Sequence, residues 1–266
     1  MKQKEQNRES YLRQFHAQQK QIEKTEAYIR KYKAGSRSTM AKSRQKQLDK
    51  IERLTPPASA AKAIFDFPFA PIVTTLAVET TDLVIGYERP LLAPINLTIR
   101  FGETVAIRGF NGIGKSTLLK TLIGEITQLD GDYHFPDNTK INYFSQDLHW
   151  EKPLETPLQY LSAQFPKATT KELRRQLAKS GLVNQLASEP LSTLSGGEQT
   201  KVKLAQLTMN QGNLLILDEP TNHIDHETKD SLQKGIQKFP GTVIIVSHEQ
   251  EFYQDLADRV IEIEGL

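Results

Sequence analysis

The sequence predicts an α/β fold with a parallel core sheet and a helical lobe, preceded by an α-helical antiparallel hairpin. Three observations predict it. A glycine-rich segment stands between a strand pattern and a helix pattern, short uninterrupted apolar runs occur further along the chain, and the first 55 residues show a basic, helical periodicity. Uninterrupted apolar runs bounded by turn residues are typical of strands that are covered on both faces in a parallel sheet.

The composition is that of a globular chain with a sizeable core. Of 266 residues, 38% are hydrophobic and 25% are charged, and cysteine is absent. No apolar run approaches the ~20 residues that a membrane helix needs, so no transmembrane segment is expected. The N-terminus is polar and basic, unlike a secretory signal, and the lack of cysteine is compatible with a reducing compartment. We therefore expect a cytoplasmic protein.

The charge is distributed unevenly along the chain. Residues 1–55 hold 15 Lys/Arg and 6 Asp/Glu, a net charge of +9, whereas the remaining residues carry −7. A basic appendage on an acidic globule favours contact with a polyanion, of which nucleic acid is the usual one. The alternative is a solvated helix with an excess of lysine.

The basic segment has the pattern of two helices. No Gly or Pro interrupts residues 5–33 or 39–54, and apolar residues such as Ile22 and Ile29 form a narrow stripe in the first helix. The break at Gly35 predicts an antiparallel hairpin over residues 1–55; a single extended helix with a break is the alternative. The basic residues expected at its tip, and proposed to contact RNA, are Arg30, Lys31, Lys33, Arg37, Lys42, Arg44 and Lys46.

Residues 56–72 are predicted to be a proline-rich connector. Pro56 and Pro57 cannot continue a helix, because proline lacks the backbone donor and clashes with the preceding turn. Phe65, Phe67 and Phe69 follow in an irregular apolar segment that is expected to pack on the surface of the globule. The nucleotide-binding domain is expected to span residues 73–266.

From Val73 onward the pattern changes to strands and then to helices. Residues 154–188 contain few β-branched residues and predict an all-helical lobe, and a further amphipathic helix is expected at 201–209. Strands are predicted at 75–79, 83–87, 95–101, 103–108, 132–135, 141–144, 214–217, 242–246 and 260–263.

The glycine-rich segment Gly109–Thr117 reads GFNGIGKST and fits the phosphate-binding pattern G-x-x-x-x-G-K-[ST] at each fixed position. A strand is expected before it and a helix at 117–123 after it, which is the setting that the pattern requires. Glycines let the backbone direct its N–H groups at phosphate oxygens. A glycine-rich turn without nucleotide is the alternative. The expected nucleotide-binding residues are Gly109, Asn111, Gly112, Gly114, Lys115, Ser116 and Thr117, with Lys115 at the β/γ-phosphates and Ser116 on Mg²⁺.

Two acids end the apolar run at 214–217. Asp218 is expected to hold the Mg²⁺ shell and Glu219 to act as the general base toward the attacking water. The alternative is that the pair only caps the next helix. His248 follows the run at 242–246 and is expected on the same edge of the sheet, near the γ-phosphate. Gln146 is expected to contact Mg²⁺ or water and to transmit the nucleotide state to the helical lobe.

A second glycine segment, Ser195-Gly-Gly-Glu198, stands at a helix start. Such a segment forms an anion-binding nest. Alternatively, Ser195 and Glu198 form a capping box, because they fit the pattern S-x-x-E.

Taken together, Gly109–Thr117, Gln146, Leu194–Glu198, Leu217–Asp225 and His248 resemble the ATP-binding-cassette ATPases from Val73 to the C-terminus. The segment Asp-Glu-Pro-Thr-Asn-His resembles the corresponding sequence in the ABC-F branch, whose members are soluble cassette proteins that act on ribosomes. Residues 1–55 look like the linker hairpin of that branch, which reaches toward ribosome-bound tRNA. Ile224 stands where that branch usually has leucine.

The resemblance implies a P-loop NTPase fold of the ABC ATPase type, with an antiparallel β subdomain beside the parallel core sheet. It also implies ATP and Mg²⁺ as ligands and a head-to-tail pair of cassettes. In that arrangement Ser195, Gly196, Gly197 and Glu198 contact the γ-phosphate held by the partner, and Asp225 lines the interface. It also implies that Tyr87 stacks on adenine; a core tyrosine is the alternative. Because ABC-F chains usually carry two cassettes and this sequence has one, we expect the C-terminal part of a longer protein, or else a homodimer.

The resemblance therefore implies an ATPase, slow or inactive without a partner cassette, that acts on translation as a routine factor or in antibiotic resistance. One alternative function is an ATPase subunit that energises a membrane transporter. The other is a nucleotide-gated clamp, in which ATP hydrolysis serves only to reset the clamp.

Overall fold

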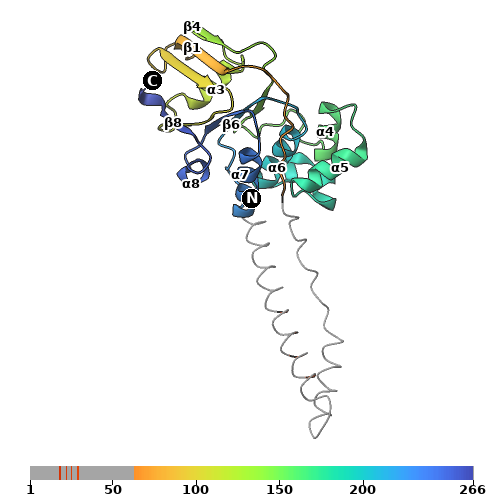
Figure 1. Cartoon of the computed structure of the whole chain (residues 1–266). Helices are drawn as coiled ribbons and strands as arrows, with labels where there is room; N and C mark the ends of the chain where they lie inside the picture. Colours follow the sequence, from red (N-terminus) through yellow and green to blue (C-terminus); the bar gives the residue numbers. More distant parts are fainter. Residues whose placement is uncertain (1–17, 19–21, 23–24, 26–28, 30–62, 266) are drawn as a thin grey trace. The chain divides into compact units, whose positions relative to one another are not determined.

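The computed structural model describes Gln18, Ile22, Thr25, Ile29 and residues 63–265 (Figure 1). The four separate residues are helical, in agreement with the helix predicted there. The basic residues predicted at the hairpin tip, from Arg30 to Lys46, lie outside the described residues. The chain divides into two compact units, 1–59 and 60–266, and the second carries the features that follow.

A five-stranded parallel sheet forms the centre of this unit, in the order β5-β6-β7-β3-β8. Its strands are β3 (Thr104–Arg108), β5 (Ile141–Phe144), β6 (Leu214–Asp218), β7 (Thr242–Val246) and β8 (Arg259–Glu262). Each residue of β6 and β7 is buried, which explains their uninterrupted apolar sequence. The predicted strands at 141–144 and 242–246 are confirmed at both ends.

An antiparallel sheet in the order β2-β1-β4 covers one side of the parallel sheet. It comprises β1 (Leu76–Val84), β2 (Ile95–Arg100) and β4 (Asp130–His134). The prediction of two strands at 75–79 and 83–87 is wrong, because a single strand runs from Leu76 to Val84 and residues 85–87 lie outside it. Asp82 takes a left-handed φ of 46° at an irregularity in the pairing. The Asn96 side chain accepts from Asp82 N and donates to Asp82 Oδ1, and these bonds hold the irregularity within a continuous strand.

The helices are α3 (Lys115–Leu122), α4 (Pro157–Gln164), α5 (Thr170–Lys179), α6 (Gly196–Leu207), α7 (His226–Gln237) and α8 (Gln250–Tyr253), with short 3₁₀ turns at Asn184–Ser188, Leu191–Thr193 and Ile263–Gly265. Helices α3 and α6 begin earlier than predicted. Capping boxes at Thr156, Thr169 and Ser195 start α4, α5 and α6.

Three groups of buried side chains organise the unit. One lies between the antiparallel sheet, α3 and one face of the parallel sheet, and a second packs α7 and α8 on the opposite face. The third belongs to the predicted helical lobe and gathers Leu161, Leu173 and Leu177 with Trp150. The lobe therefore has a core of its own, and α6 contributes side chains to both the lobe core and the core of the sheet.

From Ala63 onward the connector packs against the sheet unit, and the second compact unit comprises residues 60–266. Phe65 and Phe67 are only 2% and 8% exposed. The backbone passes so close to α7 that a Cβ on Gly235 would lie 2.4 Å from Phe65 O, so only glycine fits there. Ala70 N donates to Gly212 O at 2.7 Å, and Gly212 N donates to Pro68 O at 3.0 Å. The segment therefore packs on the globule as predicted, and this packing buries both phenylalanines.

Within the part of the chain that the structure describes, no helix has the length and apolar character needed to cross a membrane.

Candidate functional site

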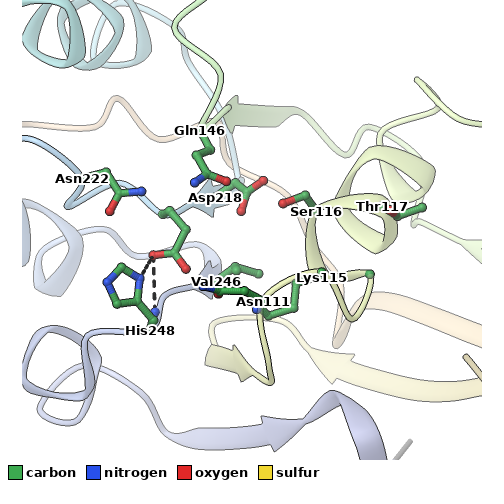
Figure 2. A pocket seen from close by; sticks show the side chains of 12 residues that line it. Asn111, Lys115, Ser116, Thr117, Gln146, Asp218, Asn222, Val246 and His248 are labelled. Carbon is green, nitrogen blue, oxygen red and sulfur yellow. Dashed lines mark hydrogen bonds and ion pairs between the residues drawn. The ribbon is translucent and has the colours of Figure 1, made fainter. Parts of the chain in front are cut away.

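A cleft of about 430 Å³ opens at the carboxyl ends of β6 and β7, where α3 begins. In doubly wound sheets this edge is where ligands bind. Figure 2 shows most of its side chains converging on one space. The lining residues are Asn111, Gly112, Gly114, Lys115, Ser116, Thr117, Gln146, Asp218, Glu219, Asn222, Val246 and His248. The structure therefore brings together the predicted phosphate loop, both acids, Gln146 and His248. Asn222 and Val246 were not predicted.

The phosphate loop presents backbone donors to the cleft. Gly112 and Gly114 have φ values of 84° and 116°, which residues with a side chain rarely adopt. Gly114 is the N-cap of α3, and no side chain in the described part of the chain caps that helix end. Its first N–H groups and the positive end of the helix dipole are thus available for an anion.

Lys115 is folded over this loop. Its side chain is largely buried, and Nζ donates to Gly109 O at 2.8 Å and to Phe110 O at 3.0 Å. These carbonyl contacts hold the ammonium at the rim of the loop. A phosphate group in the loop would therefore meet a cation that the loop itself has already oriented.

Asp218 is buried in the floor of the cleft, with 1% of its surface exposed. Burial raises the pKa of its carboxyl group, the Ser116 hydroxyl acts to lower that pKa, and the charge of Glu219 raises it further. Atom Oδ1 has no hydrogen-bond partner among the described residues. A buried, unpaired carboxylate oxygen is costly unless a cation is present. The residues at this position thus fit a divalent cation.

The surrounding oxygen atoms indicate which cation. Ser116 and Gln146 flank Asp218 and direct polar groups to the same space (Figure 2). The described residues contain no cluster of three or more His, Cys, Asp or Glu side chains suited to a metal. Mg²⁺ is usually held by one or two carboxylates together with phosphate oxygens rather than by a full protein cage. The arrangement fits Mg²⁺ that arrives with a nucleotide.

Glu219 follows Asp218 in a left-handed conformation, with φ of 49°. This conformation is unusual for a residue with a side chain and is held by the bond from Glu219 N to Val246 O at 2.8 Å. Oε2 accepts from His248 N at 3.3 Å and lies 2.8 Å from His248 Nδ1 (Figure 2). Only 6% of Glu219 is exposed. The carboxylate is thus oriented into the cleft, and the expectation that the two acids only cap a helix does not describe it.

The segment Ser195–Glu198 lies away from the cleft at the start of α6. Glu198 Oε2 accepts from Ser195 N and Ser195 Oγ, both at 2.8 Å, and Glu198 N donates to Ser195 Oγ. The capping box is therefore confirmed. A Cβ on Gly197 would lie 2.4 Å from His223 O, so this glycine lets the loop after Glu219 pack closely against the segment.

Asp225 lies at the end of that loop and caps α7. Partial burial acts to raise its pKa, but the Lys201 ammonium, at 2.9 Å from Oδ2, and the Thr228 N–H outweigh it and hold the pKa at about 2. Lys201 belongs to α6, so this ion pair joins the second glycine segment to the loop that follows the acids.

Tyr87 is 66% exposed and does not line the cleft. The alternative of a core tyrosine is therefore wrong. Its ring remains free to stack on a flat ligand.

Similarity to known proteins agrees with the nucleotide site that the geometry of the cleft indicates. A family model described as ABC transporter matches residues 92–222, and a second with the same description matches residues 1–67. The ABC transporter ATP-binding protein YfmM of Bacillus subtilis is 39% identical over 94% of this chain and 48% of its own length. Human ATP-binding cassette sub-family F member 3 is 32% identical over 95% of this chain and 36% of its own length. The chain thus spans half or less of these relatives.

The fold is also that of solved cassettes. A dimeric ATP-binding cassette, solved in a post-hydrolysis state with ADP and Pi bound, is 24% identical and superposes with a TM-score of 0.61 over 70% of this chain and 94% of that one.

Proposed function

Because the chain belongs to the ABC-F branch of the ATP-binding cassette proteins, we propose that its cleft binds ATP with Mg²⁺ and hydrolyses it to ADP and phosphate. The observation that carries this proposal is the arrangement of the two adjacent acids, Asp218 and Glu219, at the end of β6. Asp218, near Ser116, has a buried oxygen without a hydrogen-bond partner among the described residues, and the neighbouring Glu219 is oriented by His248.

Each residue has a separate task in this proposal. The phosphate loop and Lys115 bind the β- and γ-phosphates, while Ser116, Gln146 and Asp218 would hold Mg²⁺, which neutralises phosphate charge. Glu219 takes the proton of the attacking water as the general base. His248 holds the Glu219 carboxylate in place and lines the same cleft, from where it would contact the γ-phosphate.

The variant Glu219→Gln tests the role of Glu219, because it keeps the size of the side chain and removes its basicity. We expect turnover to fall by about 10²- to 10⁴-fold, the usual contribution of a general base, and ATP affinity to stay near that of the wild type. The matched control is the exposed Glu251→Gln in α8, which leaves both unchanged. Equal loss of binding and turnover would mean that Glu219 only supports the structure.

We further propose that a second cassette completes the site, either from another part of a longer protein or from a second copy. The Ser195–Gly197 segment lies outside the cleft of its own chain, so it is free to contact phosphate held by a partner. Turnover of the isolated chain would then be slow and rise more steeply than linearly with protein concentration. Strict proportionality at high specific activity would refute the shared site.

We also propose that this ATPase acts on ribosomes through residues 1–55, whose net charge of +9 suits a polyanion. Replacing Arg37, Lys42 and Arg44 by Gln weakens ribosome co-sedimentation and flattens its dependence on salt. The matched control replaces Lys152, Lys167 and Lys171, three exposed lysines of the lobe region, and leaves binding unchanged. Equal effects in both triple variants, or no effect in the first, would contradict ribosome binding through residues 1–55.

The second candidate is an ATPase subunit of a membrane transporter, because both matching family models carry the description ABC transporter. It leaves the charge of residues 1–55 without a role. Affinity purification of the chain from its cells distinguishes the two: we expect ribosomal particles, and recovery with an integral membrane protein would favour the transporter.

A further inference from the structure

Trp150 lies where the loop that carries Gln146 enters the helical lobe, and its ring is enclosed on several sides. Tyr160 of α4 meets it edge to face, with 4.9 Å between the ring centroids, and Lys203 Nζ lies 4.7 Å from its centroid. Only 8% of the tryptophan is exposed. An aromatic edge and a cation over the face both favour one fixed ring orientation.

The fixed ring places its single donor on Gln199. Trp150 Nε1 donates to Gln199 Oε1 at 2.7 Å, and the same amide uses Nε2 to donate to Leu194 O at 3.0 Å. Because both ends of the amide are engaged, turning it over would place a donor against the indole N–H and an acceptor against the carbonyl. The indole therefore fixes the orientation in which Gln199 holds Leu194.

Leu194 immediately precedes the Ser195–Gly197 segment, so its carbonyl sets the entry of the chain into that segment. On the other side, Trp150 is joined to the cleft by a short, internally bonded loop. Asp147 N donates to Ser145 Oγ at 3.1 Å, and His149 N donates to Asp147 Oδ1 at 2.9 Å. Gln146, which lines the cleft, belongs to the same loop.

We propose that Trp150 is a positioning residue that, through Gln199, holds the Ser195–Gly197 segment in register with the loop of Gln146. The two segments then move together, so the loop that lines the chain's own cleft also sets how the second glycine segment is presented to a partner's nucleotide. This inference rests on the proposed function, which gives the second segment its phosphate.

The test compares variants that each remove one donor. Trp150→Phe keeps an aromatic ring and removes the N–H to Gln199, whereas the matched control Tyr160→Phe removes the hydroxyl that donates to Gln206 at 2.6 Å, on the same helix but remote from Leu194. Amide hydrogen exchange is measured on peptides that cover residues 194–198 and, for comparison, α4 and α5, in the full chain without nucleotide.

Trp150→Phe raises exchange in residues 194–198 by about three- to tenfold, the effect of losing one hydrogen bond on local opening. Tyr160→Phe leaves these residues unchanged. Gln199→Glu keeps the acceptor and removes the donor to Leu194, so it raises exchange to a similar extent. The double variant Trp150→Phe/Gln199→Glu then adds little, because both changes break one chain of bonds.

Unchanged exchange in Trp150→Phe would overturn the inference, and so would an equal rise across α4 and α5, which would show a general loss of packing. In the ATPase assay Trp150→Phe lowers kcat while KM stays close to that of the wild type; an unchanged kcat also overturns it. A wild type that neither binds ATP nor hydrolyses it at high protein concentration contradicts the proposed function instead, and the exchange measurement, which needs no nucleotide, then decides this inference by itself.

Discussion

Replacing Phe65 by alanine tests whether the connector is a structural part of the cassette. The ring is 2% exposed and packs in the group of side chains beneath α7, so its removal leaves a cavity that the close contact with Gly235 prevents from collapsing. A buried Phe→Ala change costs about 3–5 kcal/mol. For a folded unit of this size that corresponds to a fall in Tm of roughly 10 °C.

The measurement is thermal and urea unfolding of the full chain, followed by far-ultraviolet circular dichroism. The matched control is the neighbouring Ile64→Ala, whose side chain is 53% exposed and whose stability we expect to change by less than about 0.5 kcal/mol. If both variants unfold together with the wild type, the connector is not part of the cooperative unit and the reasoning from burial fails.

Two further predictions concern charges. Because Lys201, together with Thr228, lowers the pKa of Asp225 from 3.8 to about 2, the ion pair with Lys201 stabilises the fold above pH 4 and loses that effect as the pH falls through about 2. Lys201→Met is therefore less stable than the wild type at neutral pH, and the difference in unfolding free energy vanishes in acid; a constant difference would refute the ion pair. Asp218→Asn removes a carboxylate whose pKa is raised by burial, so at pH 7 it raises the Tm of the nucleotide-free chain while abolishing the extra stability given by Mg²⁺ and ATP. A lower Tm without nucleotide would contradict the cost assigned to Asp218.

The sequence predicts the core strands well where both faces of a strand are buried, because such a strand reads as a short continuous apolar run, as in β6 and β7. It fails at β1, because a local signal cannot show that Asn96, on the next strand, holds Asp82 within a continuous strand. It also places the start of α6 too late, since glycines in the first turn hide a helix that the Ser195–Glu198 capping box stabilises.

The features of the site also divide into those that the sequence predicts and those that it does not. The phosphate loop, Asp218 and Glu219 follow from local patterns, because each stands at a strand end or a helix start. The bonds from Trp150 to Gln199 and from Gln199 to Leu194 do not, because the first joins residues 49 positions apart and polar pairs of this kind leave no periodicity. The burial of Phe65 depends likewise on the absence of a side chain at Gly235, far along the sequence.

Trp150 is the single tryptophan of the sequence. The indole emission of the unlabelled protein therefore comes from one place, the junction between the loop of Gln146 and the helical lobe. The ammonium of Lys203 beside the ring and the acceptor on its N–H are both groups to which an indole's emission responds. Rapid mixing of the native chain with nucleotide would thus let spectroscopy follow that junction in real time, without a dye or an added residue.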